Sequence, residues 1–235
     1  MTTLKVDDLP QPLALALFSY EFSKLIDCGI SLVRSLDILS ESVPPPYNDA
    51  ARQIQKQVEE GQMLSKTMQA MPELFPPFFC LMVRAGEVGG VLEVTLQRAA
   101  DLMTKEWKLS RRGEGEPIFL VNSSGRAVPD DWDNFPPYQK TLTLLLFCET
   151  FGLLLASGAP ILQTMEVMAE MLPPVQKEAM MQARLAIRNG EPMRLGFLPR
   201  LVQELLSVGE EAGTLDLTLD RAAAIYEHEL ECRML

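Results

Sequence analysis

The sequence has 235 residues, enough for one large domain or two small ones, and 47% of them are hydrophobic, enough to form a core in each. The formal net charge is −11 and the isoelectric point is about 4.7. This charge argues against a dedicated nucleic-acid-binding surface, which needs clustered lysine and arginine, and against simple electrostatic docking to anionic lipid.

Hydrophobic residues recur at helical spacing in the first half of the chain, and proline and glycine fall between the periodic stretches. Pro44–Pro46, for example, marks a break between two such stretches. The pattern predicts helices near residues 11–27, 30–42, 48–60, 63–70, 76–85 and 89–107.

The segment 108–136 differs in composition and reads as a polar connector. Within it, the apolar run 117–121 is followed by Asn-Ser-Ser-Gly at 122–125, which predicts one strand and a turn, consistent with a small hairpin. The basic pair Arg111–Arg112 is interpreted as part of a solvated linker.

The second half is again helical, with stretches near 136–156, 159–171, 174–189, 198–208 and 212–231. Residues 141–162 are apolar over a length that would suffice to cross a membrane. However, Glu149 would lie near the middle of the bilayer, and Gly158 and Pro160 interrupt the segment. We therefore expect a buried helix here and not a membrane span.

The two halves are copies of one repeat. Residues 84–96 and 207–219 both read Gly-Glu-x-x-Gly-x-Leu-x-x-x-Leu from the third residue onward. Upstream, Phe22 matches Phe151 at an offset of 129, whereas the motifs match at an offset of 123 (Gly86 to Gly209). About six residues are therefore missing from the second copy before Pro199, which predicts that its fourth helix is lost or reduced to a turn.

We interpret the repeated motif as a structural corner between two helices. The first glycine is expected to end a helix, the glutamate to cap the next one, the second glycine to let the two helices approach, and the first leucine to enter the core. In this order the residues are Gly86, Glu87, Gly90 and Leu92 in the first copy and Gly209, Glu210, Gly213 and Leu215 in the second. Matching glycines at further helix ends are Gly29, Gly61, Gly158 and Gly190.

No catalytic, cofactor-binding or metal-binding site is predicted. The single histidine, His228, lies on a charged helix face, and an acidic site at Glu87 and Glu210 is the only enzymatic alternative that the residues support. The four cysteines form no CxxC pair and are expected to be buried free thiols in a reducing compartment. The acidic, polar N-terminus does not resemble a signal peptide.

Both copies show the same order of features: an apolar stripe ending in Gly29 or Gly158, a step to Gly61 or Gly190, a proline, and the Gly-Glu-x-x-Gly-x-Leu motif. This ordered set resembles the F-type domain of the type II secretion system, which is shared with the inner-membrane platform protein of type IV pili. The resemblance covers about residues 11–107 and 140–231. It implies an all-α fold of two tandem antiparallel helical bundles, each of about six short helices, with a first repeat at 1–107, a connector at 108–136 and a second repeat at 137–235.

The resemblance also implies a function, that of a non-enzymatic scaffold that contacts a cytoplasmic assembly ATPase and inner-membrane platform subunits, with homo-oligomers possible and no nucleic acid or cofactor bound. Family members carry transmembrane helices after their repeats, whereas the first repeat here leads into a polar connector. We therefore expect a cytoplasmic protein, or one peripheral to the cytoplasmic face of the inner membrane. The alternative is a divergent soluble interaction module with no membrane or secretion role.

Overall fold

The computed structural model describes residues 9–110, 137–170, 172 and 174–234. All regular secondary structure within these residues is helical, which confirms the all-α class. The chain divides into two compact units, one for each copy of the repeat, and the division falls within residues 111–136. The predicted strand and turn at 117–125 and the pair Arg111–Arg112 lie outside the described residues, and the finer domain limits remain predictions.

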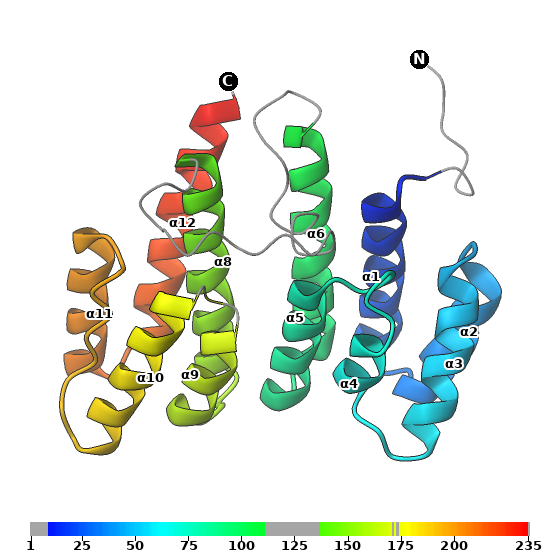
Figure 1. Ribbon diagram of the computed structural model, residues 1–235, viewed down its shortest axis with the longest axis horizontal. Coiled ribbons are helices and arrows are strands. Elements are labelled where there is room, and N and C mark those ends of the chain that lie inside the picture. Colours follow the sequence, from blue (N-terminus) through cyan, green and yellow to red (C-terminus); the bar gives the residue numbers. More distant parts are fainter. Residues whose placement is uncertain (1–8, 111–136, 171, 173, 235) are drawn as a thin grey trace. The chain divides into compact units, whose positions relative to one another are not determined.

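Within the part of the first unit that the structure describes, six helices pack largely against their neighbours in sequence (Figure 1). Helix α1 packs along α6, α2 packs against α3, and α5 contacts both α4 and α6. The helices are α1 (Gln11–Asp27), α2 (Leu32–Ser42), α3 (Tyr47–Glu59), α4 (Leu64–Gln69), α5 (Pro77–Gly89) and α6 (Leu92–Ser110).

Aromatic rings fill the centre of the first unit. Phe18 of α1 lies 5.6 Å from Tyr47 and 5.9 Å from Phe75, measured between ring centroids, and Phe75 lies 5.8 Å from Phe79 of α5. All four side chains are almost completely buried. Rings at these separations contribute both apolar burial and edge or offset contacts, and they connect helices that are distant in sequence.

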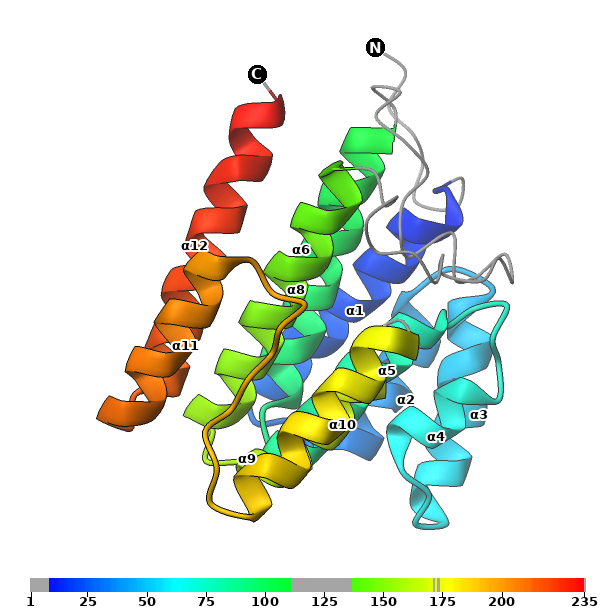
Figure 2. The same cartoon turned by 60° about the vertical axis from the view of Figure 1, so that its left-hand side comes forward.

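The second unit repeats this arrangement with one helix fewer among its described residues. Helix α8 packs along α12, α9 packs against α10, and α11 packs against α12. Figure 2 shows the chain passing from α10 to α11 as a long loop, where the first unit has α4. The predicted loss of the fourth helix is therefore observed. The helices are α8 (Pro137–Ala156), α9 (Ile161–Glu170), α10 (Pro174–Arg188), α11 (Arg200–Ala212) and α12 (Leu215–Met234).

Helix α8 contains most of the apolar segment that was long enough for a membrane span. Its side chains are buried around much of the helix, including Leu142, Leu145, Phe147 and Phe151. A helix that is apolar on all sides is typical of a protein core. Among the described helices, none combines the length and the apolarity needed to cross a bilayer.

The cysteines differ from expectation. Cys80 and Cys148 are buried, but Cys28 and Cys232 are exposed, and all four are free thiols. The prediction of buried thiols was therefore wrong for two of them. Cys28 follows the last residue of α1, and Cys232 lies in the last turn of α12. At these positions the helix end leaves the side chain open to solvent.

Candidate functional site: the repeated glycine and glutamate motif

The repeated motif forms the corner of two helical hairpins, α5–α6 and α11–α12. In both, the first glycine lies inside the helix and the second glycine ends it. Gly90 and Gly213 have backbone φ angles of +67° and +68°, a left-handed conformation that a residue without Cβ adopts at little cost. The prediction that Gly86 and Gly209 end the helices was wrong, and α5 and α11 continue to residues 89 and 212.

Gly86 and Gly209 instead make the close helix contact that the sequence analysis assigned to Gly90 and Gly213. A Cβ atom on Gly86 would lie 2.1 Å from Thr95 Oγ1 and 2.8 Å from Leu92 Cα of α6. A Cβ atom on Gly209 would lie 2.2 Å from Thr218 Oγ1. At Gly90 and Gly213 a Cβ would meet no atom within 4 Å. The two glycines of the motif therefore have exchanged roles relative to the prediction.

Thr95 and Thr218 are the partners that the sequence analysis missed. Both are buried, and each hydroxyl donates a hydrogen bond to a carbonyl of its own helix, Thr95 to Leu92 O at 3.1 Å and Thr218 to Leu215 O at 3.0 Å. The signal was present in the sequence, because a threonine precedes the second leucine of the motif in both copies. In both units this threonine lies where the two helices of the hairpin come closest to the glycine.

Glu87 caps a helix, but a different one from that predicted. Its Oε1 accepts the Leu64 N–H at 2.7 Å, and its Oε2 accepts the Ser65 N–H at 3.1 Å and the Ser65 hydroxyl. These groups form the N-terminus of α4, which precedes Glu87 in the chain by more than 20 residues. A carboxylate at this position satisfies amides that no carbonyl can reach and meets the positive end of the helix dipole.

Glu210 makes the equivalent contact although the second unit has lost the helix. Both of its carboxylate oxygens lie 3.0 Å from the N–H of Met193. Met193 is the repeat equivalent of Leu64, because it lies three residues after Gly190 as Leu64 lies three residues after the matching Gly61. The glutamate therefore holds the same point of the chain in both units, independently of whether a helix starts there. A cavity of about 250 Å³ lies beside this contact, lined in part by Met193, Leu195, Gln203 and Glu210.

The remaining residues of the predicted motif occupy helix ends and the hairpin interior. The prediction that Leu92 and Leu215 enter the core was wrong, because both are only half-buried next to the glycine contact. The second leucines of the motif, Leu96 and Leu219, are the buried ones. Four further glycines have positive φ angles, each two residues after the last residue of helix α1, α3, α8 or α10, and they are Gly29, Gly61, Gly158 and Gly190.

The chemistry of this arrangement is that of structural capping. The Glu87 carboxylate already accepts three hydrogen bonds from α4. His228 is exposed and lies on α12 near Glu231, 3.9 Å from its carboxylate, and near Cys232. Within the described residues, no group of three histidine, cysteine, aspartate or glutamate side chains is placed to hold a metal ion.

The family follows from a comparison of the amino-acid sequence with known proteins. A family model described as type II secretion system (T2SS), protein F, matches residues 18–115 and again residues 147–234, one match for each unit. The chain belongs to this family. Both corner motifs and both capping glutamates lie inside the matched segments.

Curated relatives of this type II secretion system protein F family extend over most of the chain. The type IV pilus assembly protein PilC of Myxococcus xanthus is 22% identical, with 91% of this chain and 70% of the relative aligned. PilC of Thermus thermophilus is 23% identical over 92% of this chain and 73% of the relative. The type II secretion system protein F of Xanthomonas campestris is 25% identical over 92% of this chain and 73% of the relative.

Proposed function

We propose that this member of the type II secretion system protein F family is a non-enzymatic scaffold of a secretion or pilus-assembly machine. It contacts the cytoplasmic assembly ATPase and other subunits of the inner-membrane platform. The observation that carries the proposal is the double match to the family, each copy with a complete corner motif whose glutamate is engaged within the fold.

The arrangement of polar groups supports a scaffold in preference to an enzyme. The two glutamates that could have formed an acidic catalytic site lie in separate units and bind backbone amides of their own unit. The hydroxyls beside the motif donate to main-chain carbonyls. The polar atoms of these glutamates and threonines therefore maintain the fold. The outer faces of the helices are then the surfaces on which partner proteins would bind.

The proposed location is the cytoplasm, or the cytoplasmic face of the inner membrane, where an assembly ATPase would be accessible. The acidic net charge of −11 supports contact with protein partners over direct adsorption to anionic lipid. A homo-oligomer is compatible with this role.

Affinity purification after chemical cross-linking in the native cells tests the proposal. The tagged full chain is recovered from soluble and detergent-solubilised fractions, and its partners are quantified by mass spectrometry against an unrelated acidic helical protein that carries the same tag. We expect specific enrichment of an assembly ATPase and platform subunits. Intact bait that enriches neither class in either fraction would instead support a soluble interaction module.

A further inference from the structure

The exposed apolar side chains of the second unit are concentrated on one hairpin. Of the eight large apolar side chains that are exposed within the described residues, four lie on α11 and α12. Leu201 and Val208 of α11 are 55% and 59% exposed, and Leu217 and Ile225 of α12 are 54% and 41% exposed. Grouped apolar side chains at this exposure are typical of interaction sites.

These side chains lie on the same side of the hairpin. On α11, Leu201, Leu205 and Val208 are spaced at i, i+4 and i+7 and therefore share one face. The two helices touch where Gly209 meets Thr218. Val208 comes directly before Gly209 on α11, and Leu217 comes directly before Thr218 on α12. In an antiparallel pair of helices, residues that precede the contacting residues point to the same side.

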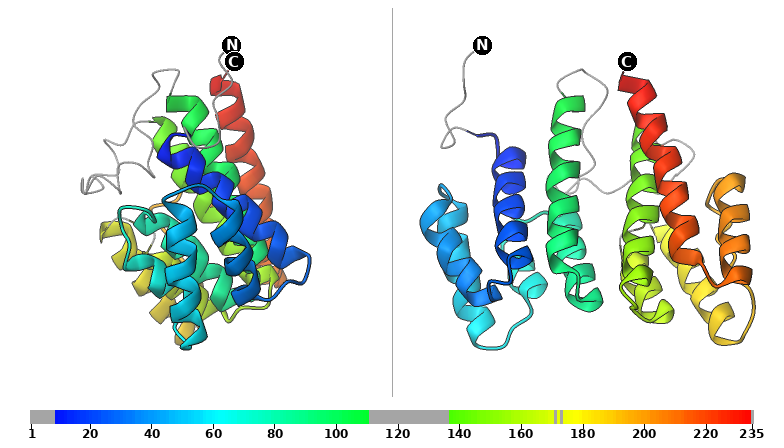
Figure 3. Two further views of the ribbon diagram at one scale, coloured as in Figure 1. Left: turned by 90° about the vertical axis from the view of Figure 1, so that its right-hand side faces the viewer. Right: turned by 180° about the vertical axis from the view of Figure 1, so that it is seen from behind.

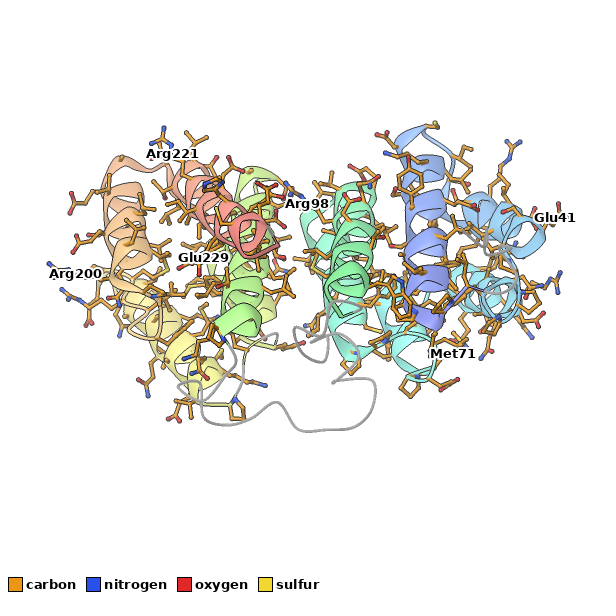
Figure 4. All side chains as sticks on the ribbon, turned by 90° about the horizontal axis from the view of Figure 1, so that it is seen from above. Glu41, Met71, Arg98, Arg200, Arg221 and Glu229 are labelled. Atoms are coloured by element: carbon orange, nitrogen blue, oxygen red, sulfur yellow. The ribbon has the colours of Figure 1, made fainter. Side chains whose placement is uncertain are left out.

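The opposite side of the hairpin is the interior of the unit, which confirms the orientation. Leu219 follows Thr218 and is fully buried, and Glu210 follows Gly209 and binds Met193. In the view from behind in Figure 3, no other helix of the second unit lies in front of α11 and α12. Figure 4 shows Arg221 on the outer side of α12 and Glu229 on its inner side, where Glu229 accepts a hydrogen bond from Thr141. We call the outer surface the α11–α12 face; its apolar members are Leu201, Leu205, Val208, Leu217 and Ile225.

Carboxylates border the α11–α12 face along both long edges. Glu204 and Glu211 lie on the α11 edge, and Asp220 and Glu231 lie on the α12 edge; all four are exposed. Glu204 forms only a solvent-exposed pair with Arg200 at 3.7 Å, which contributes little to stability. Arg200 at the start of α11 and Arg221 within the face are the cations of this surface in the described residues. The apolar stripe is therefore flanked mainly by negative charge.

We propose that the α11–α12 face binds an amphipathic helix of a partner protein, whose apolar stripe is flanked on both sides by lysine or arginine. Leucine-type side chains of such a helix fit between Leu201, Val208 and Leu217, and its basic flanks meet the carboxylates on the two edges. A second copy of this acidic chain would bring like charges together at the edges. The inference goes beyond the proposed function, because it holds for whichever machine the chain serves.

Binding of designed helical peptides to the full chain tests this. One peptide carries leucines at i, i+3, i+4 and i+7 with lysines on both flanks, and its twin carries glutamates in place of the lysines. Affinities are measured by fluorescence anisotropy at low and at physiological salt. We expect the lysine peptide to bind and the glutamate peptide to bind at least roughly tenfold more weakly, with the difference shrinking as salt is added.

Variants locate the site. Val208→Gln combined with Leu217→Gln should weaken the lysine peptide by roughly tenfold or more, whereas Leu185→Gln, at an equally exposed position of α10, should leave its affinity unchanged. Glu211→Lys combined with Asp220→Lys should weaken the lysine peptide and strengthen its glutamate twin. Because all of these positions are exposed, the variants are expected to retain the thermal unfolding of the parent protein, and the charge-reversal pair gives an independent result if the glutamine pair does not fold.

Three results would overturn the proposal. The first is that neither peptide binds, or that both bind equally. The second is that binding of the lysine peptide is unaffected by both the glutamine pair and the charge-reversal pair. The third is a concentration-dependent dimer in light scattering that the glutamine pair dissociates, because the face would then belong to a second copy of the chain.

Discussion

Gly86 of α5 lies so close to Thr95 of α6 that a Cβ atom on the glycine would come within 2.1 Å of the threonine Oγ1. The second unit repeats this contact between Gly209 and Thr218 at 2.2 Å. Both copies of the repeat therefore have the same point of closest contact between the two helices of the hairpin. This contact determines which side chains of the two helices point outward.

Replacement of Gly86 or Gly209 by alanine should lower the free energy of unfolding. The added methyl group meets the next helix, including its backbone, and overpacking of this kind costs about 1–3 kcal/mol. Gly196→Ala is the matched control, since a Cβ there meets no atom within 4 Å and its φ is not left-handed. Urea denaturation of the three variants measures the effect. Equal stability of Gly86→Ala and Gly196→Ala would show that the close contact is absent.

Gly90→Ala and Gly90→Leu should destabilise the protein by similar amounts. The sequence-based interpretation of Gly90, a close approach of two helices, would make the cost of a leucine there one of overpacking. The structure instead leaves space around Gly90 and holds it at a φ of +67°. A side chain of any size is then strained by about 1–2 kcal/mol. Thermal and urea unfolding compare the two variants with the parent. A leucine variant several kcal/mol less stable than the alanine variant would restore the overpacking explanation.

Loss of the Glu87 carboxylate should loosen the start of α4. In Glu87→Ala the amides of Leu64 and Ser65 lose their acceptor, which typically costs about 1–3 kcal/mol for buried polar groups, while Glu87→Gln keeps one acceptor oxygen and should cost less. Amide hydrogen exchange at these two residues measures the local effect, with the exposed Glu41→Ala as control. Unchanged protection of both amides in Glu87→Ala would contradict the capping role. Glu210→Ala should have a smaller effect, because a single backbone amide depends on it.

The corner motif shows how far the sequence determines the site. Proline and glycine positions predicted the order of the helices, and the six-residue deletion predicted the loss of the fourth helix in the second unit, because these signals are local. Gly86 and Gly90 could not be assigned their roles locally, since each is a suitable helix end. The assignment depends on Thr95, which meets Gly86 only in the folded hairpin. Likewise, the partner of Glu87 lies at Leu64, and this long-range contact has no local pattern.

Alkaline pH should destabilise the protein through its buried thiols. Burial raises the pKa of Cys80 and of Cys148 from about 9 to about 12. Below pH 9 the thiols are protonated in both the folded and unfolded states and contribute no pH dependence. Between about pH 9 and 12 the unfolded thiols ionise while the folded ones stay protonated, so the free energy of unfolding falls, by up to about 1.4 kcal/mol per pH unit for each thiol.

Urea denaturation at pH 8 and pH 10 measures this pH dependence. Cys148→Ala should show a smaller difference between the two pH values than the parent protein, although its stability at pH 8 is also lower because a buried side chain is shortened. Cys232→Ala is the control, since that thiol is exposed. An identical pH dependence in the parent and in Cys148→Ala would contradict the assigned burial.

Direct binding between the purified full chain and the purified assembly ATPase from the same organism tests the central claim most directly. Isothermal titration calorimetry, at a salt concentration that screens non-specific attraction, should give a saturable isotherm with a defined stoichiometry. The proposed scaffold role predicts such binding. If the correctly folded chain and an active ATPase give no binding signal by calorimetry and do not co-elute in size-exclusion chromatography, the proposal of an ATPase-contacting scaffold is contradicted.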